Sequence, residues 1–129
     1  MINCPCSSNK PYDECCKPFH QEEEIPTTAE ELMRSRYSAY VVVNGDYLIK
    51  TTHPSKRKEY NKDDLEEWGK TNEWLKLEIT DTPTPNIVTF KAFYRDIDGV
   101  IQLHYERSVF QKLNNKWYYV SGTFVDDQI

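Results

Sequence analysis

The chain has 129 residues, a net charge of −5 and 38% hydrophobic residues, which is material for one domain. Aromatic residues make up 13% of the chain, which excludes wholesale disorder because disordered chains are poor in such residues. The acidic balance argues against a general nucleic-acid binder, which needs a basic face to release counterions. No apolar run is long enough for a membrane-spanning helix or a secretory signal, so we expect a cytoplasmic protein without membrane insertion.

All four cysteines lie within the first 16 residues, as Cys4-Pro5-Cys6 and the adjacent pair Cys15-Cys16. Disulfides between them would close only small loops, and nothing in the sequence supports an oxidising compartment. Two thiolates from each pair can instead meet at one tetrahedral centre, with Zn–S distances of about 2.3 Å. The pattern predicts one Zn²⁺ per chain, bound by Cys4, Cys6, Cys15 and Cys16.

Four thiolates fill all positions of a tetrahedral zinc ion, so we expect a structural rather than a catalytic metal. Two alternatives stay open at this stage. The thiols could be free or paired in disulfides, or His20 could replace Cys16 as the fourth ligand at a longer spacing.

The cysteine pattern, one residue between the first two and eight residues before the pair, resembles the SEC-C motif. That motif is the zinc-binding tail of the secretion ATPase SecA, where it contacts the chaperone SecB and the ribosome. The resemblance implies that residues 1–20 form a zinc knuckle that docks a protein partner related to the export chaperone or the ribosome.

The next segment predicts helices. Residues 17–27 form a connector with little pattern, and the four residues from Thr28 to Glu31 then have the form of a capping box. Apolar and aromatic residues recur behind this box at helical spacing. The predicted helices span residues 29–43, 47–52 and 62–68, and the second and third begin after the caps Asp46 and Asn61.

From residue 74 the sequence changes to a period of two, which indicates strands. In the first strand Leu75, Leu77 and Ile79 are expected on one face. Asp98-Gly99 and Asn114-Asn115 mark turns between neighbouring strands. Helices followed by an antiparallel meander give an α+β fold, in which a curved sheet wraps over the helices as a cone. The predicted strands lie at 75–79, 88–94, 100–112 and 117–121.

The long third strand has two different faces. Ile101, Leu103, Tyr105 and Val109 share one of them, and His104, Glu106 and Ser108 share the other. The polar face could point to solvent. If it is instead concave, Glu106 needs a buried partner, for which Arg34 or Arg36 is the natural candidate.

Several further motifs occur in order behind the cysteines. They are Leu32-Met33-Arg34-Ser35-Arg36-Tyr37, Asp46-Tyr47-Leu48-Ile49-Lys50-Thr51, His53-Pro54, Glu73-Trp74-Leu75, Glu106-Arg107-Ser108 with Phe110, Trp117-Tyr118-Tyr119-Val120 and Gly122-Thr123. Together these motifs resemble the YchJ family of bacterial proteins, which has no settled biochemical activity. The resemblance implies an NTF2-like (cystatin-like) α+β domain over residues 28–129, behind a SEC-C knuckle.

NTF2-like cones often hold a pocket, and several residues of this chain could bind a ligand or move a proton there. Each of these candidate pocket residues could equally have a structural role in a surface ion pair, as a core aromatic residue or at a helix end. No nucleophile motif, phosphate loop or diagnostic carboxylate pair appears, and we prefer the structural role. The candidate pocket residues are Arg34, Tyr37, His53, His104, Glu106, Arg107 and Tyr118.

Three functional hypotheses follow from these observations. The preferred one is a non-enzymatic, zinc-binding accessory protein whose knuckle docks a protein partner, with homodimer formation left open. The second is a small-molecule binder or enzyme that uses a pocket in the cone. The third is nucleic-acid binding through the knuckle, which the near-neutral charge around the cysteines disfavours.

Overall fold

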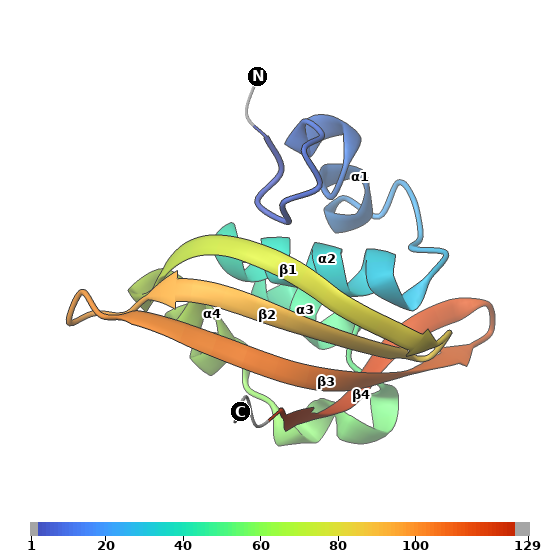
Figure 1. The fold of residues 1–129 in the computed structure, drawn as a ribbon. Helices are drawn as coiled ribbons and strands as arrows, with labels where there is room; N and C mark the ends of the chain where they lie inside the picture. The colour runs from blue at the N-terminus through green and yellow to red at the C-terminus, as the bar shows by residue number, and fades with distance from the viewer. Residues whose placement is uncertain (1–2, 126–129) are drawn as a thin grey trace.

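Figure 1 shows the computed structural model, which describes residues 3–125; the outer ends of the predicted units 1–20 and 28–129 lie outside the described residues. Helices precede a four-stranded antiparallel sheet with the strand order β1-β2-β3-β4, which confirms the predicted α+β meander. The elements are η1 (Tyr12–Glu14), α1 (Lys17–His20), α2 (Ala29–Val41), α3 (Gly45–Lys50), η2 (Pro54–Glu59), α4 (Lys62–Thr71), β1 (Glu73–Thr84), β2 (Ile87–Arg95), β3 (Ile101–Leu113) and β4 (Lys116–Phe124).

The layers follow this order. The sheet is long and curved, and helices α2, α3 and α4 lie behind it. The N-terminal segment (blue) lies above α2 in this view (Figure 1). Within residues 3–125, no helix has the length and apolar character needed to cross a membrane.

Helix caps follow the local sequence at two of the three predicted positions. Thr28 Oγ1 accepts from the backbone N–H of Glu31 at 3.0 Å, and Asn61 caps α4 in the same way. Helix α3 begins differently, because Asn44 and not Asp46 caps it through Tyr47 N–H at 3.0 Å. The prediction of Asp46 as a cap was wrong, since α3 starts at Gly45, two residues earlier than the sequence pattern indicated.

Three predicted boundaries also change. The 17–27 connector contains the short helix α1, whose four residues are too few to produce a periodic signal. Helix α2 ends at Val41, before the predicted end at residue 43. Helix α4 runs through Gly69 to Thr71, although the sequence predicted an end before this glycine.

The larger of two hydrophobic clusters joins α2, the sheet and the N-terminal segment. From α2 it takes Leu32, Met33 and Tyr37, which face the buried side of the sheet. Cys4, Cys6 and Cys16 belong to the same cluster. The cysteine segment is therefore packed into the core. The sheet contributes Leu77, Val88, Phe90, Ala92 and Phe110.

A bulge explains one exposed apolar residue on β1. The pairing of β1 with β2 shifts register between Trp74 and Lys76, so Leu75 no longer shares a face with Leu77. Leu75 is 40% exposed and Leu77 only 4%. The predicted common face of Leu75, Leu77 and Ile79 was wrong at its first member, because a bulge has no signature in the alternation itself.

The polar face of β3 is the concave one. His104 lies opposite Ala92 and Glu106 opposite Phe90 in the register of β2 with β3, so these residues share the buried face. Ile101, on the other face, is 59% exposed. Of the two orientations left open by the sequence, the structure takes the one that places Glu106 inside the cone.

Candidate metal centre

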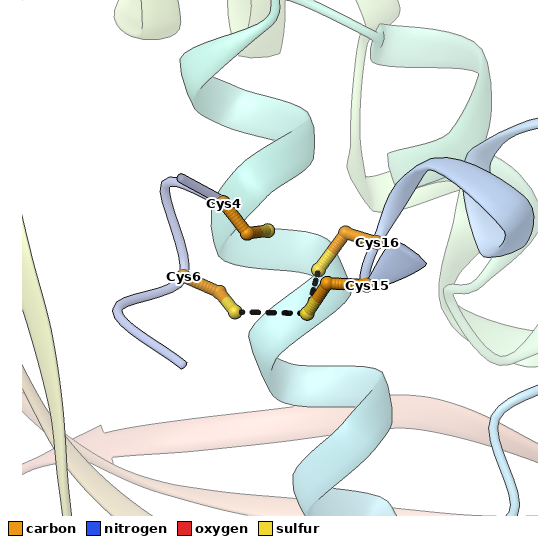
Figure 2. A group of neighbouring side chains, drawn as sticks. All are labelled: Cys4, Cys6, Cys15 and Cys16. Atoms are coloured by element: carbon orange, nitrogen blue, oxygen red, sulfur yellow. Dashed lines mark hydrogen bonds between the residues drawn. The ribbon is translucent and has the colours of Figure 1, made fainter. Parts of the chain in front are cut away.

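The four cysteine sulfurs form one compact group. They all lie within 4.8 Å of one another, and the Sγ–Sγ distances are 3.6 Å for Cys6–Cys15 and 4.0 Å for Cys15–Cys16 (Figure 2). A disulfide bond needs about 2.05 Å, so these sulfurs are unbonded thiols. Four ligands at about 2.3 Å from a tetrahedral metal lie about 3.8 Å apart. The spacing therefore fits a four-thiolate metal centre.

The backbone of the first loop brings the two pairs of cysteines together. Cys4 N–H donates to the carbonyl of Lys10 at 2.8 Å, which folds the segment back on itself. Ser7 and Asn9 both have φ of 67°, in the left-handed region that favours glycine. Short polar side chains tolerate this region better than bulky ones, so the loop closes tightly without glycine.

Ionisation of the cluster favours a bound cation. Hydrogen bonds from Cys16 and Cys4 lower the pKa of the Cys6 thiol, so Cys6 carries the negative charge most readily. Hydrogen bonds of Cys16 to Cys4 and Cys6 raise the pKa of Cys16. Burial is the main cause that raises the pKa of Cys15 to about 11. Without a cation, the cluster therefore resists carrying more than one negative charge. A divalent metal would offset that repulsion, so all four sulfurs could be thiolates.

His20 does not compete for the metal. Its Nδ1 lies 2.7 Å from the hydroxyl of Tyr12, and its Nε2 lies 2.8 Å from the carbonyl oxygen of Ser35. A carbonyl can only accept, so Nε2 donates and Nδ1 accepts from the tyrosine. Both ring nitrogens are thereby engaged, and His20 ties the N-terminal segment to α2.

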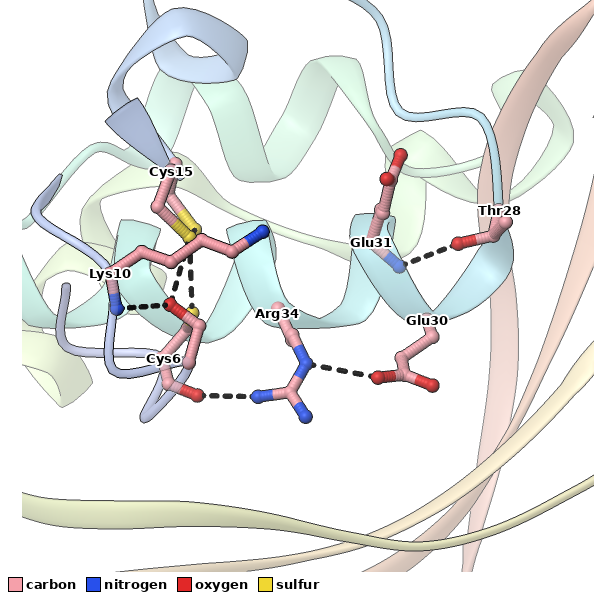
Figure 3. A network of polar contacts seen from close by, with 9 residues as sticks. Cys6, Lys10, Cys15, Thr28, Glu30, Glu31 and Arg34 are labelled. Atoms are coloured by element: carbon pink, nitrogen blue, oxygen red, sulfur yellow. Dashed lines mark hydrogen bonds and ion pairs between the residues drawn. The ribbon is translucent and has the colours of Figure 1, made fainter. Parts of the chain in front are cut away.

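The cysteine segment is fixed to α2 and β1 by further polar contacts. Arg34 Nη1 donates to the carbonyl of Cys6 at 2.8 Å, while its Nε binds Glu30 Oε2 at 3.1 Å (Figure 3). Cys4 Sγ lies 3.4 Å from the hydroxyl of Ser38, and Ser7 Oγ accepts from Leu77 N–H at 3.1 Å. The knuckle thus packs against α2 and does not extend away as a free arm.

A surface cleft of about 500 Å³ lies beside the metal centre. Cys15 and Cys16 form part of its wall, and the start of α2 forms another part. The side of α2 that faces the cleft is drawn in Figure 3. The polar residues that line the cleft are Ser8, Lys10, Glu14, Glu24, Glu30, Glu31 and Arg34.

A second cavity, of about 120 Å³, lies inside the cone between α2, α4 and the sheet. Three of the predicted pocket residues, Tyr37, His104 and Glu106, line it together. No residue of the cysteine segment contributes to its lining among residues 3–125, so the knuckle does not form its lid.

The other four predicted pocket residues lie elsewhere. Arg34 holds the knuckle, as described, and Arg107 is exposed on β3. His53 caps η2 by accepting from Ser55 N–H at 3.1 Å, and its ring lies beside Tyr118. Tyr118 lines a separate surface cleft near Arg57.

Glu106 is a largely buried carboxylate of the cone, with 14% of its side chain exposed. It accepts from His104 Nε2 at 2.7 Å, from the hydroxyl of Tyr119 at 3.1 Å and from the hydroxyl of Ser108. Burial alone raises the pKa of Glu106, but these three hydrogen bonds outweigh burial and hold the pKa below its usual range.

The expected partnership of Glu106 with Arg34 or Arg36 was wrong. Arg36 Nη1 donates to the carbonyl of Leu48 at 2.9 Å and to Thr51 Oγ1 at 2.7 Å, and its guanidinium lies 4.5 Å from the ring centre of Tyr119. Hydrogen-bond donors on His104, Ser108 and Tyr119 take the place that an arginine would have taken beside Glu106. The sequence did not single out Trp74 or Tyr119 as cavity residues, because strand register decides which residues meet there.

Comparisons with known proteins agree with this architecture. Residues 28–122 match a family model described as YchJ, middle NTF2-like domain. A knuckle with four clustered cysteines packed on an NTF2-like α+β domain is the class of protein that fold and site define. The chain belongs to the YchJ family, which confirms the resemblance seen in its motifs.

Relatives of similar sequence are found in several bacteria. A UPF0225 protein of Haemophilus influenzae (strain 86-028NP) is 44% identical over 127 residues, covering 95% of this chain and 78% of the relative. A UPF0225 protein of Geobacter sulfurreducens is 37% identical over 131 residues, covering 97% and 81%.

Two solved structures also match. The solution structure of a SEC-C motif containing protein from Rhodopseudomonas palustris has a TM-score of 0.89 at 36% identity, covering 97% of this chain and 100% of that chain. The crystal structure of a SEC-C motif containing protein from Psychrobacter arcticus has a TM-score of 0.78 at 30% identity, covering 98% and 84%.

Proposed function

We propose that this protein is a non-enzymatic accessory protein that binds one structural zinc ion and docks a protein partner beside the knuckle. The ligands are Cys4, Cys6, Cys15 and Cys16. The cleft next to these cysteines, on a face held rigidly by α2, is the observation that supports docking. Reduced thiols at the metal fit a cytoplasmic setting.

Zinc is the metal that suits this donor set. Thiolates are soft ligands, and four of them in tetrahedral arrangement are typical of structural zinc. Three of the four cysteines are buried. A bound zinc ion would therefore have no open position for water or substrate, which supports a structural rather than a catalytic role.

Metal analysis of the full chain, purified without chelator, tests the first half of the proposal. We expect about one zinc per chain, released as the pH falls, because protons compete with the metal for the thiolates. A metal-free protein that stays reduced and folded would contradict the proposal.

The charges around the cleft favour a basic partner segment. Glu30 is paired with Arg34, so the uncompensated carboxylates are Glu14, Glu24 and Glu31, against the single charge of Lys10. A four-thiolate zinc centre adds a net negative charge of about two at the same place. Lysine or arginine side chains of a partner, from the export machinery or the ribosome, would meet complementary charge here.

Charge reversal tests the docking surface without disturbing the fold. We expect Glu14→Lys combined with Glu24→Lys to weaken partner binding about tenfold, with a reduced dependence on salt, because both carboxylates are exposed at the cleft. The matched control is Glu67→Lys combined with Asp81→Lys, which makes the same charge change on exposed sites that do not line the cleft.

The measurement compares immobilised, zinc-loaded wild type with both variants. Purified ribosomes and bacterial lysate are applied, and the captured proteins are quantified by mass spectrometry. The proposal expects proteins that wild type and control retain and that the cleft variant loses. Identical captured sets for all three proteins would refute docking at the cleft.

A further inference from the structure

The cavity inside the cone contains polar atoms that have no partner within the fold. Tyr37 is only 3% exposed, yet no hydrogen bond within residues 3–125 uses its hydroxyl. The same holds for the hydroxyl of Tyr40 and for Nδ1 of His104. Each of these atoms keeps some accessible surface, and the three residues that carry them line the cavity. Polar groups in a largely buried site are normally paired, so water or a ligand in the cavity is the available partner.

We propose that this cavity binds a small, neutral, single-ring compound that donates a hydrogen bond, from N–H or O–H, to Nδ1 of His104. This site is separate from the docking function proposed above. Its lining comes from α2, α4, the segment before α4 and all four strands, so a failure of one proposal leaves the other standing.

The size and the walls of the cavity select a flat ring. An apolar protein cavity of about 150 Å³ accommodates benzene, and this one has about 120 Å³. The rings of Tyr40, Trp68 and Trp74 lie against one another with centroid distances of 4.8 to 5.9 Å. Aromatic walls favour edge-to-face or offset contact with another planar ring. Aliphatic compounds of the same volume would gain less from such walls.

The charges in the cavity favour a neutral ligand. Glu106 already accepts three hydrogen bonds and needs no cation from a ligand. An anion would be repelled by this carboxylate and a cation by the guanidinium of Arg36, and both residues line the cavity. A neutral, polar ring avoids both repulsions.

The proposed contact uses the neutral form of His104. In that form the carboxylate of Glu106 accepts from Nε2 at 2.7 Å, so the imidazole carries its proton on Nε2 and its lone pair on Nδ1. The carboxylate then fixes the tautomer and the ring orientation, as carboxylates do for histidines that bind metals. His104 keeps 21% of its side chain exposed, so the cavity is open to solvent near this residue.

An NMR titration of the full, zinc-loaded chain tests the proposal. The probes are phenol and 2-pyridone, which donate a hydrogen bond, and toluene, which has the shape of phenol without a donor. We expect saturable shifts of the Ala92 methyl group and the indole N–H groups of Trp68 and Trp74, with binding of a donor probe about tenfold tighter than that of toluene. The long-range ¹H–¹⁵N spectrum should show the His104 Nδ1 resonance move with the same saturation.

Two variants locate the site. Ala92→Val fills the cavity directly across from His104 and is expected to weaken donor-probe binding at least about tenfold. Thr123→Val, at an exposed position of β4, is the matched control and should bind as wild type does. Tyr37→Phe keeps the wall and removes only the hydroxyl, so it reports on the site even if Ala92→Val fails to fold.

Three results would overturn the proposal: no saturable shift at Ala92, Trp68 or Trp74 for either donor probe, equal affinity for toluene and the donors, or a His104 Nδ1 resonance that stays fixed through the titration. Any of them would mean that ordered water alone completes the polar atoms of the cavity.

Discussion

Replacing Cys6 with Ser is expected to abolish zinc binding and to lower the free energy of unfolding of the whole chain by at least about 3 kcal/mol. Cys6 is fully buried and belongs to the core cluster that includes Leu32 and Met33 of α2. Loss of the metal would separate the two cysteine pairs and expose this side of the helix. In a chain of this size, the melting temperature should fall by roughly 10 °C.

Lys10→Ala is the control for this experiment. Lys10 lies in the same loop, but its side chain is exposed and its contacts to Cys4 and Ser8 are made by the backbone. We expect it to keep about one zinc per chain and to change the free energy of unfolding by less than about 0.5 kcal/mol. Chelation of wild type should reproduce the thermal shift of Cys6→Ser; an unchanged melting temperature in both would show that the metal has no part in folding.

The same measurement bears on how the chain is divided. The sequence predicts a knuckle at 1–20 and a separate domain at 28–129. The structure ties them together through Arg34, His20 and the shared core. We therefore expect one cooperative transition that includes both units. A first transition that depends on metal, followed by unfolding of an intact cone, would mean that they are thermodynamically independent.

Local sequence made the cysteine cluster predictable. The four cysteines lie close together in the sequence, and the alternatives to a metal site were free thiols or disulfides, or His20 in place of Cys16. The Thr28 and Asn61 caps and the two strand turns are also local, since each involves residues within four positions. Asn114 and Asn115 both adopt positive φ at the predicted turn.

The cone interior was not predictable in this way because its pairing is non-local. The alternation of polar residues on β3 is typical of a face that points to solvent. In the structure, however, the hydroxyl of Tyr119 on β4 donates a hydrogen bond to Glu106 on this face. Ser108 and His104, on the same strand as Glu106, supply the other hydrogen bonds to its carboxylate, so the carboxylate needs no arginine partner. The hydrogen-bond partners in this network come from two strands, and the register between the strands decides which residues meet.

Gly69→Ala is expected to destabilise the fold by about 2 kcal/mol, against the direction that helix propensity gives. Gly69 lies inside α4, where alanine in place of glycine would by itself stabilise a helix by about 1 kcal/mol. However, a Cβ atom on Gly69 would lie 2.5 Å from the carbonyl oxygen of Tyr40. That oxygen is backbone near the end of α2, so the two helices must move apart.

The movement would spread, because Tyr40 and Trp74 both depend on this contact. Tyr40 packs edge-on against Trp68 with centroids 5.3 Å apart, and the indole of Trp74 donates to the carbonyl of Gly69 at 3.1 Å. Gly45→Ala is the matched control, because the three atoms nearest to its Cβ belong to the side chains of Glu66 and Lys62 and not to backbone. Denaturant unfolding should therefore show a smaller loss for Gly45→Ala than for Gly69→Ala. Equal losses of stability in the two variants would contradict the prediction, because the Tyr40 carbonyl would then resist the new methyl group no more than side chains do. A Gly69→Ala variant that is more stable than wild type would also contradict it.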